Sequence, residues 1–365
     1  MLVVLDSFWL DVLDGCFGWL FWMDIFMDVG CFGWIFSWMF SNVYKDYCFY
    51  FTYSYSFMTN TYPISFSIPT EKFQTVKSSL VFAEKTRILS PLIPGDTSTY
   101  IYETEDSYYQ QYKESYFALT MKKGGWDCMR HYEIVMCGCV PYFVDIEQCP
   151  ENTMALWDKQ MLLEANALYR TAFENKSIES LTPEDLAAYA ALRDRFLAHL
   201  EDRFTAGNMA KYVLNTAGFS DAKRVLYLSG QTGEDYLRCV TLAGMKEVLG
   251  DGCHDYPRIP HVYKGEPIDY RALYGRGFTY SDIVDPSLRD GSRDVSIEED
   301  IRNKYYDVVI YGSYHRGVPY YDLVSSVYEP NKVILLCGED AYFHNMCFDH
   351  HVYSQRGNIV FVREL

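Results

Sequence analysis

The stretch that decides the fold reads Lys122-Lys123-Gly124-Gly125-Trp126-Asp127-Cys128-Met129-Arg130-His131-Tyr132-Glu133-Ile134. An apolar run follows and closes on Gly138-Cys139-Val140-Pro141. A buried strand expected over residues 116–120 enters the Gly-Gly turn, and a helix expected to begin near Trp126 leaves it. A strand, a glycine turn and a helix in this order are typical of a phosphate site at the carboxyl end of a strand in an α/β sheet.

Arg130 and Glu133 lie three residues apart, so a helix would place both on one face. A guanidinium can bind a diphosphate through two parallel hydrogen bonds, and a carboxylate can accept from two sugar hydroxyls. The start of the helix would add free backbone N–H groups that attract phosphate. This combination suits a nucleotide sugar. The residues alone are also compatible with a solvated Arg130–Glu133 ion pair beside an ordinary turn.

The segment 115–150, with Lys-Gly-Gly-Trp-Asp-Cys-Met-Arg-His-Tyr-Glu-Ile and Gly-Cys-Val-Pro, resembles the donor-site segment of exostosin-like glycosyltransferases of the GT-B type. The resemblance implies that Glu133 binds ribose or sugar hydroxyls of the donor. It also implies that Arg130, with Lys122 or Lys123, neutralises the leaving diphosphate. The donor-binding residues predicted in this way are Lys122, Lys123, Gly124, Gly125, Arg130 and Glu133.

The two halves of the chain stand in swapped order relative to this family. In the relatives, a Rossmann-like half with Tyr-Gly-Ser-x-His-Arg-Gly and Gly-Glu-Asp comes first and ends in Phe-x-Arg-Glu-Leu, and the donor half, opening with Pro-Ile-x-Phe-x-Ile-Pro, follows. Here the opening motif is at 63–69, and Phe-Val-Arg-Glu-Leu is at 361–365. Either the chain is circularly permuted, which close surface termini tolerate, or it joins two units and leaves the donor half without its own acceptor half.

Composition limits the classes of function. A chain of 365 residues can hold two ordinary domains. With 32 Lys plus Arg against 49 Asp plus Glu, the net charge is −17, which argues against binding the phosphate backbone of a nucleic acid. The eleven cysteines show no regular framework, and Cys137 and Cys139 are too close for the usual zinc pair. We therefore expect reduced thiols, a cytoplasmic protein, no metal and no cofactor apart from the nucleotide-sugar substrate.

Residues 1–62 differ from the rest in their high content of Phe, Tyr and Trp. A unit repeats at a spacing of fifteen, as Gly15-Cys16-Phe17-Gly18-Trp19 and Gly30-Cys31-Phe32-Gly33-Trp34. Residues 15–40 are long enough to span a membrane, but Asp24 and Asp28 would each cost ~2.5–3.5 kcal/mol near a helix centre. No basic residue precedes Lys45. A low-complexity segment and linker is thus favoured over a membrane anchor.

The remaining pattern predicts an α/β protein with two Rossmann-like domains of the GT-B type. Residues 63–205 would form the donor domain, and residues 222–365 the acceptor side. We expect strands over 64–68, 79–82, 87–89, 116–120, 140–144, 225–228, 307–311 and 332–336, and helices over 106–114, 126–136, 183–204 and 235–249.

Polar side chains follow two apolar strands of the second domain. His315 and Arg316 come after the strand at 307–311, and Glu339 and Asp340 after the strand at 332–336. Ligands of open α/β sheets bind at such an edge, and a histidine titrates near neutrality. We therefore predict His315 as the catalytic base and the other three as acceptor-side residues. The alternative is that His315 and Glu339 only satisfy loop backbone groups.

These observations predict a glycosyltransferase that moves a sugar from a nucleotide sugar to a glycan or other hydroxyl acceptor. The chain lacks an Asp-x-Asp sequence at a strand end, which favours a metal-independent reaction. The alternative is a non-catalytic nucleotide- or carbohydrate-binding protein made of rearranged halves.

Overall fold

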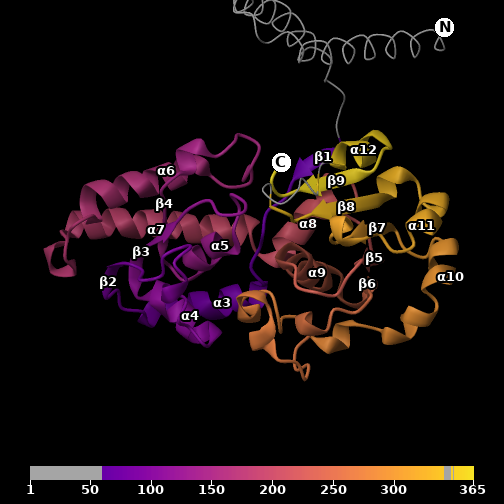
Figure 1. Cartoon of the computed structure of the whole chain (residues 1–365), viewed down its shortest axis with the longest axis horizontal. Coiled ribbons are helices and arrows are strands. Elements are labelled where there is room, and N and C mark those ends of the chain that lie inside the picture. The colour runs from indigo at the N-terminus through magenta and orange to yellow at the C-terminus, as the bar shows by residue number, and fades with distance from the viewer. Residues whose placement is uncertain (1–59, 341–346, 348) are drawn as a thin grey trace, which may run out of the picture. The chain divides into compact units, whose positions relative to one another are not determined.

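The computed structural model describes residues 60–340, 347 and 349–365 (Figure 1). All of these residues belong to one compact unit, Thr59–Leu365. The aromatic segment 1–62, and with it the choice between linker and membrane anchor, lies almost entirely outside the described residues. Within the described part of the chain, no helix combines the length and the apolar character that crossing a membrane requires.

The fold is α/β with two parallel sheets, as expected. The larger sheet has the strand order β1 (Thr61–Pro63), β9 (Ile359–Val362), β8 (Val333–Cys337), β7 (Val308–Tyr311), β5 (Val225–Leu228) and β6 (Cys253–Tyr256). The smaller sheet has the order β2 (Arg87–Leu89), β3 (Ser115–Thr120) and β4 (Val140–Phe143). Every strand pairing in both sheets is parallel.

The larger sheet is buried on both faces, which explains its continuous apolar strands. Alternate residues of one strand enter two different cores: Ile310 of β7 lies in the core that also contains residues of α8 (Ala206–Thr216) and α9 (Tyr236–Leu249). Val309 lies in the second core, which contains residues of α10 (Ile297–Arg302) and α11 (Tyr321–Val327). The last helix, α12 (His350–Gln355), precedes β9.

The smaller sheet packs with the helices of the first half, which are α3 (Thr70–Ser79), α4 (Glu105–Lys113), α5 (Met129–Met136), α6 (Lys159–Leu168) and α7 (Pro183–Arg203). The start of α7 follows its sequence signature, because Thr182 accepts from the backbone N–H of Asp185 in a capping box. The first core continues from Phe117 of the smaller sheet to Leu237 of α9. The two halves therefore share one core.

The pairing of β1 with β9 bears on the swapped order of the halves. Thr61 pairs with Val360, and Pro63 with Val362, at the edge of the larger sheet, where Figure 1 shows the indigo β1 beside the yellow β9. The strand expected over 64–68 is therefore displaced to Thr61–Pro63, and it belongs to the second half. The chain then passes to the first half, where Ile68 bridges Thr205.

Other expectations need correction. Residues 79–82 are not a strand, because α3 ends at Ser79 and a 3₁₀ turn, Leu80–Phe82, follows. The helix expected near Trp126 begins at Met129. Strands β6 and β9 were missed: β6 contains His254 and Asp255, which break its apolar pattern. A disulfide joins Cys337 and Cys347, so the expectation of reduced thiols is wrong for this pair.

Candidate ligand-binding cleft

A cleft with a volume of about 1040 Å³ lies between the two halves. Its walls come from segments that follow strands at their carboxyl ends: Leu92 after β2, Lys123–Arg130 after β3, Asp235 after β5, Arg316 after β7 and Gly338–Asp340 after β8. This is the edge at which parallel α/β sheets bind ligands. The swapped order of the halves thus still brings the predicted donor and acceptor segments to one cleft.

The Gly-Gly turn lies against carboxylates of the second half. A Cβ at Gly124 would collide with the carboxylate of Asp340, and one at Gly125 with those of Asp340 and Glu364. Glycine is needed here for this close approach. The backbone N–H groups of Trp126 and Asp127 donate to the Glu364 carboxylate at 3.1 and 2.9 Å. The N–H groups that we expected to bind phosphate are therefore occupied by a carboxylate of the protein itself.

Arg130 lines the cleft from the first turn of α5. Its guanidinium forms no salt bridge with any residue that the structure describes, and Nη1 is buried without a hydrogen-bond partner there. The titratable groups that act on it include the phenols of Tyr112 and Tyr108 and the thiol of Cys128. The solvated Arg130–Glu133 ion pair, which the residues alone also allowed, is not formed.

Glu133 is buried at the bottom of the cleft and is held by both halves. The Tyr108 hydroxyl donates to Oε2 at 2.6 Å, and the Thr279 hydroxyl donates to Oε1 at 2.5 Å. Burial raises the pKa of Glu133, and the hydrogen bonds from Thr279 and Tyr108 oppose that shift. Each oxygen keeps a second acceptor position, so the carboxylate can still accept from a ligand.

The two lysines of the turn differ in position. Lys123 is exposed and lines the cleft. Lys122 is also exposed, but its Nζ lies over the Trp126 ring, 5.4 Å from the centroid, and its backbone N–H donates to Asp145. Lys123, rather than Lys122, therefore accompanies Arg130 on the cleft wall.

The opposite wall carries a compact charge cluster. Arg316 Nε lies 2.9 Å from Asp235 Oδ2, and its Nη2 lies 3.2 Å from Glu339 Oε1. Asp235 also accepts from the backbone N–H of Arg238 at the start of α9, and this bond fixes its position. The close approach of the His315 ring is the largest cause that lowers the pKa of Glu339. The structure thus brings three of the predicted acceptor-side residues together at one edge, because Arg316, Glu339 and Asp340 all line the cleft.

His315 does not line the cleft with them. Its side chain is only 1% exposed, and its Nε2 lies 2.7 Å from Glu339 Oε1. The ring is therefore covered by the residue that we expected to stand beside it. A direct contact between His315 and an acceptor is not supported by this geometry, and Glu339 is the group that faces the cleft.

Sequence reasoning missed Arg363, which joins the two walls. This buried guanidinium donates to the carbonyl of Asp127 and, through Nε, to the carbonyl of Gly338 at 2.9 Å. It also pairs with the carboxylates of Asp340 and Glu364. The signal was the Phe-Val-Arg-Glu-Leu motif, which we used only to compare the order of the halves.

Sequence reasoning also missed the loop 274–282, which supplies Tyr274, Phe278 and Tyr280 to the cleft. The Phe278 ring stacks on Tyr108 of the first half, with centroids 5.6 Å apart. Thr279 is fully buried at φ +72°, a strained conformation for a β-branched residue. Strain of this kind persists only where surrounding contacts enforce it, here the bonds of Thr279 to Glu133 and Glu105. The signal in the sequence was the glycine- and aromatic-rich run Tyr274–Tyr280.

Comparison of the chain with protein-family models, with curated protein sequences and with solved structures gives no match.

Proposed function

We propose that this protein is a glycosyltransferase of the GT-B type, similar to exostosin-like enzymes, that transfers a sugar from a nucleotide sugar to a glycan or other hydroxyl acceptor. Two parallel sheets direct their carboxyl ends to one cleft, and ligands of α/β proteins bind at this edge. The cleft volume of about 1040 Å³ is at the upper end of the range of small-molecule sites and accommodates a nucleotide sugar together with an acceptor hydroxyl.

The observation that carries the proposal is the guanidinium of Arg130, which has no salt-bridge partner among the described residues and whose Nη1 has no hydrogen-bond partner there. A buried N–H group without a partner costs roughly 1–3 kcal/mol, and more when it is charged. The oxygens of a diphosphate would satisfy this group and could engage the guanidinium at two points. Lys123 adds a second positive charge on the same wall.

In the proposed reaction, Arg130 and Lys123 stabilise the negative charge that develops on the diphosphate as the glycosidic bond breaks. Glu133 orients the donor by accepting from its hydroxyls, beside the bonds from Tyr108 and Thr279. On the other wall, Glu339 contacts the acceptor hydroxyl. His315 then acts as a positioning residue, since its Nε2 holds Glu339 from behind.

The test is thermal unfolding of the full chain with UDP, GDP, CDP and their sugars. A ligand at 100 times its Kd should add about 2.7 kcal/mol of stability. We expect a shift with one nucleotide family that is lost in Arg130→Met and reduced in Glu133→Ala and Lys123→Met. Arg302→Met is the control, because Arg302 is an exposed residue of α10 that does not line the cleft. No shift with any nucleotide, or an equal shift in Arg130→Met, would overturn the proposal.

A specific observation favours a second candidate, a non-catalytic nucleotide- or carbohydrate-binding protein. Thr279 and Tyr108 already contact both oxygens of Glu133, and Glu364 already fills the backbone N–H groups of the glycine turn. The two candidates are distinguished by an assay for released nucleoside diphosphate, run with the nucleotide sugar that binds. Release supports the glycosyltransferase. Binding without release, with a panel of oligosaccharide acceptors present, supports the second.

A further inference from the structure

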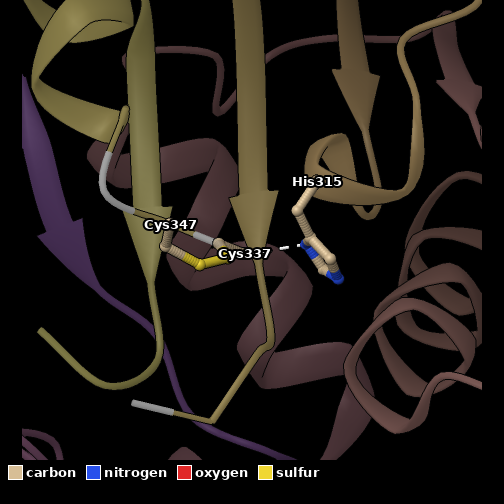
Figure 2. A group of neighbouring side chains, drawn as sticks. All are labelled: His315, Cys337 and Cys347. Atoms are coloured by element: carbon tan, nitrogen blue, oxygen red, sulfur yellow. Dashed lines mark hydrogen bonds between the residues drawn. A yellow bond between two sulfur atoms is a disulfide. The ribbon is translucent and has the colours of Figure 1, made fainter. Parts of the chain in front are cut away.

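His315, Cys337 and Cys347 form a cluster behind the acceptor-side wall (Figure 2). His315 lies in the 3₁₀ turn after β7, Cys337 is the last residue of β8, and the three ligand atoms, one ring nitrogen and two sulfurs, all lie within 4.8 Å of one another. Figure 2 shows the imidazole directed at Cys337, with Nδ1 3.5 Å from Sγ. The two cysteines are joined by the disulfide, and their Cα atoms are 6.1 Å apart.

The oxidised state leaves the imidazole without a suitable partner on this side. Glu339 Oε1 lies 2.7 Å from Nε2, so the carboxylate favours the tautomer with its proton on Nε2. The lone pair of Nδ1 then faces Cys337 Sγ, and a disulfide sulfur carries no hydrogen to donate. A thiol or a metal ion at this position would complement the lone pair.

We propose that, when the disulfide is reduced, His315 Nδ1 and the sulfurs of Cys337 and Cys347 bind one Zn²⁺ ion. With Zn–N of about 2.05 Å and Zn–S of about 2.3 Å, a tetrahedral site separates nitrogen from sulfur by about 3.6 Å. Nδ1 and Cys337 Sγ, at 3.5 Å, are already close to this separation. The sulfurs have to move to about 3.8 Å apart on the same geometry.

The chemistry balances with a dithiol as reductant. The dithiol gives two electrons and two protons to the S–S bond and becomes a disulfide, and Cys337 and Cys347 become thiols. Zn²⁺ then displaces both thiol protons. Two thiolates, a neutral imidazole and the Zn²⁺ ion have a total charge of zero. Metal binding therefore adds no net charge beside the Asp235–Arg316–Glu339 cluster.

The surroundings have the features of a zinc site. The ring nitrogen that does not bind the metal commonly faces a carboxylate, as Nε2 faces Glu339. Cys337 is fully buried and Cys347 is half-buried. An ion could therefore enter from the side of Cys347, where water would be its fourth ligand. The ion would hold the His315 ring, and the ring would in turn hold Glu339, which lines the cleft. The inference goes beyond the proposed function and does not depend on it.

The ligand spacing explains why this site could not be recognised from the sequence, from which we expected no metal. His315 precedes Cys337 by 22 residues, and Cys347 follows Cys337 by 10. Neither interval belongs to a short zinc motif. Only the pairing of β7 with β8 brings the histidine to the first cysteine.

The test uses the full chain, reduced with a metal-free dithiol, freed of the reductant without oxygen, and titrated with Co²⁺ and then Zn²⁺. We expect one equivalent of Co²⁺ with the visible absorption of a tetrahedral ion and a thiolate charge-transfer band, both displaced by Zn²⁺. His315→Ala, Cys337→Ser and Cys347→Ser should lose these bands, and Glu339→Gln should weaken Zn²⁺ binding about 10- to 100-fold. The oxidised protein should bind neither ion at this site.

Cys239→Ser is the matched control. Cys239 is a buried thiol 3.4 Å from His261 Nε2, the same kind of contact, but it belongs to no three-residue ligand group in the described part of the chain. It should retain full binding. No thiolate band in the reduced wild type, or equal bands in Cys347→Ser, would overturn the proposal. If a variant does not fold, the comparison of reduced and oxidised wild type decides.

Discussion

Two arginines of the cleft, Arg130 and Arg363, are used in opposite ways. Arg363 is 1% exposed, and it contacts two carboxylates, two backbone carbonyls and the face of Phe66. Arg130 has no carboxylate partner among the described residues, although the chain carries 49 Asp plus Glu. The difference indicates that Arg363 holds the two halves together, whereas Arg130 does not, which agrees with the proposal that it binds the diphosphate of a ligand.

The largest expected effect is the difference in stability when each arginine is replaced by methionine. Arg363→Met should lower the free energy of unfolding by about 3–5 kcal/mol, because Asp340 and Glu364 would lose their buried counter-charge. Arg130→Met should instead raise it by about 1–3 kcal/mol, because an unsatisfied buried N–H group is removed and no carboxylate loses a partner. Urea denaturation of the full chain measures both. Equal losses in the two variants would contradict the division of roles.

The second prediction concerns Asp127, whose backbone carbonyl accepts from Arg363. Burial raises the pKa of its carboxyl group from 3.8 to about 6, although Arg363 and the Tyr132 hydroxyl oppose the shift. The folded protein thus binds this proton more tightly than the unfolded chain. The resulting stability is fully present below pH 3.8 and is lost as the pH rises through about 6, a difference of roughly 3 kcal/mol.

Denaturation of wild type and Asp127→Asn between pH 4 and pH 7 measures this effect. Other buried carboxyl groups, such as Glu133 and Glu364, titrate in both proteins, so the difference between the two curves isolates Asp127. Asparagine has a single acceptor oxygen, so it keeps only one of the two bonds that Asp127 accepts from Tyr132 and from the backbone N–H of Phe66. The loss of the other bond does not depend on pH, so it shifts the difference between the curves by a constant. A pH-independent difference would show that Asp127 is charged throughout this range.

The local sequence pattern predicted the strands that border the cleft better than it predicted the contacts between the side chains that line it. The strands around β3, β5, β7 and β8 carry apolar runs that period and length identify. The pairing of Arg363 with Asp340, by contrast, depends on how two distant segments meet. The sequence likewise showed that His315 follows a strand, but only packing determines that Glu339 covers its ring. The role of Glu364 was not predicted for the same reason. Its carboxylate accepts from the backbone N–H of Asp127, which lies 237 residues earlier in the chain.

A third prediction concerns Thr279, the residue of the loop 274–282 whose hydroxyl donates to Glu133. Thr279→Ala should cost about 1–3 kcal/mol, because the buried Oε1 of Glu133 loses its hydroxyl donor. Thr279→Gly loses the same donor, but glycine adopts the positive φ of +72° without strain, so it should be about 1 kcal/mol more stable than alanine here. Urea denaturation compares them, with Thr279→Ser as the control that keeps the hydroxyl. Glycine less stable than alanine would mean that no strain is held at this position.

The smallest effect is expected for an exposed contact of this loop with the first half. Arg276 meets Glu103 through two bonds of 2.8 and 2.9 Å, a better geometry than most surface pairs have. Both side chains are well exposed, however, at 34% and 63%. A double-mutant cycle with Arg276→Ala and Glu103→Ala should therefore give a coupling of only about 0.2–1 kcal/mol, which falls further in 1 M salt. A coupling that approaches the effect of Arg363→Met, or that salt leaves unchanged, would mean that this pair shares the role of Arg363 in holding the two halves together.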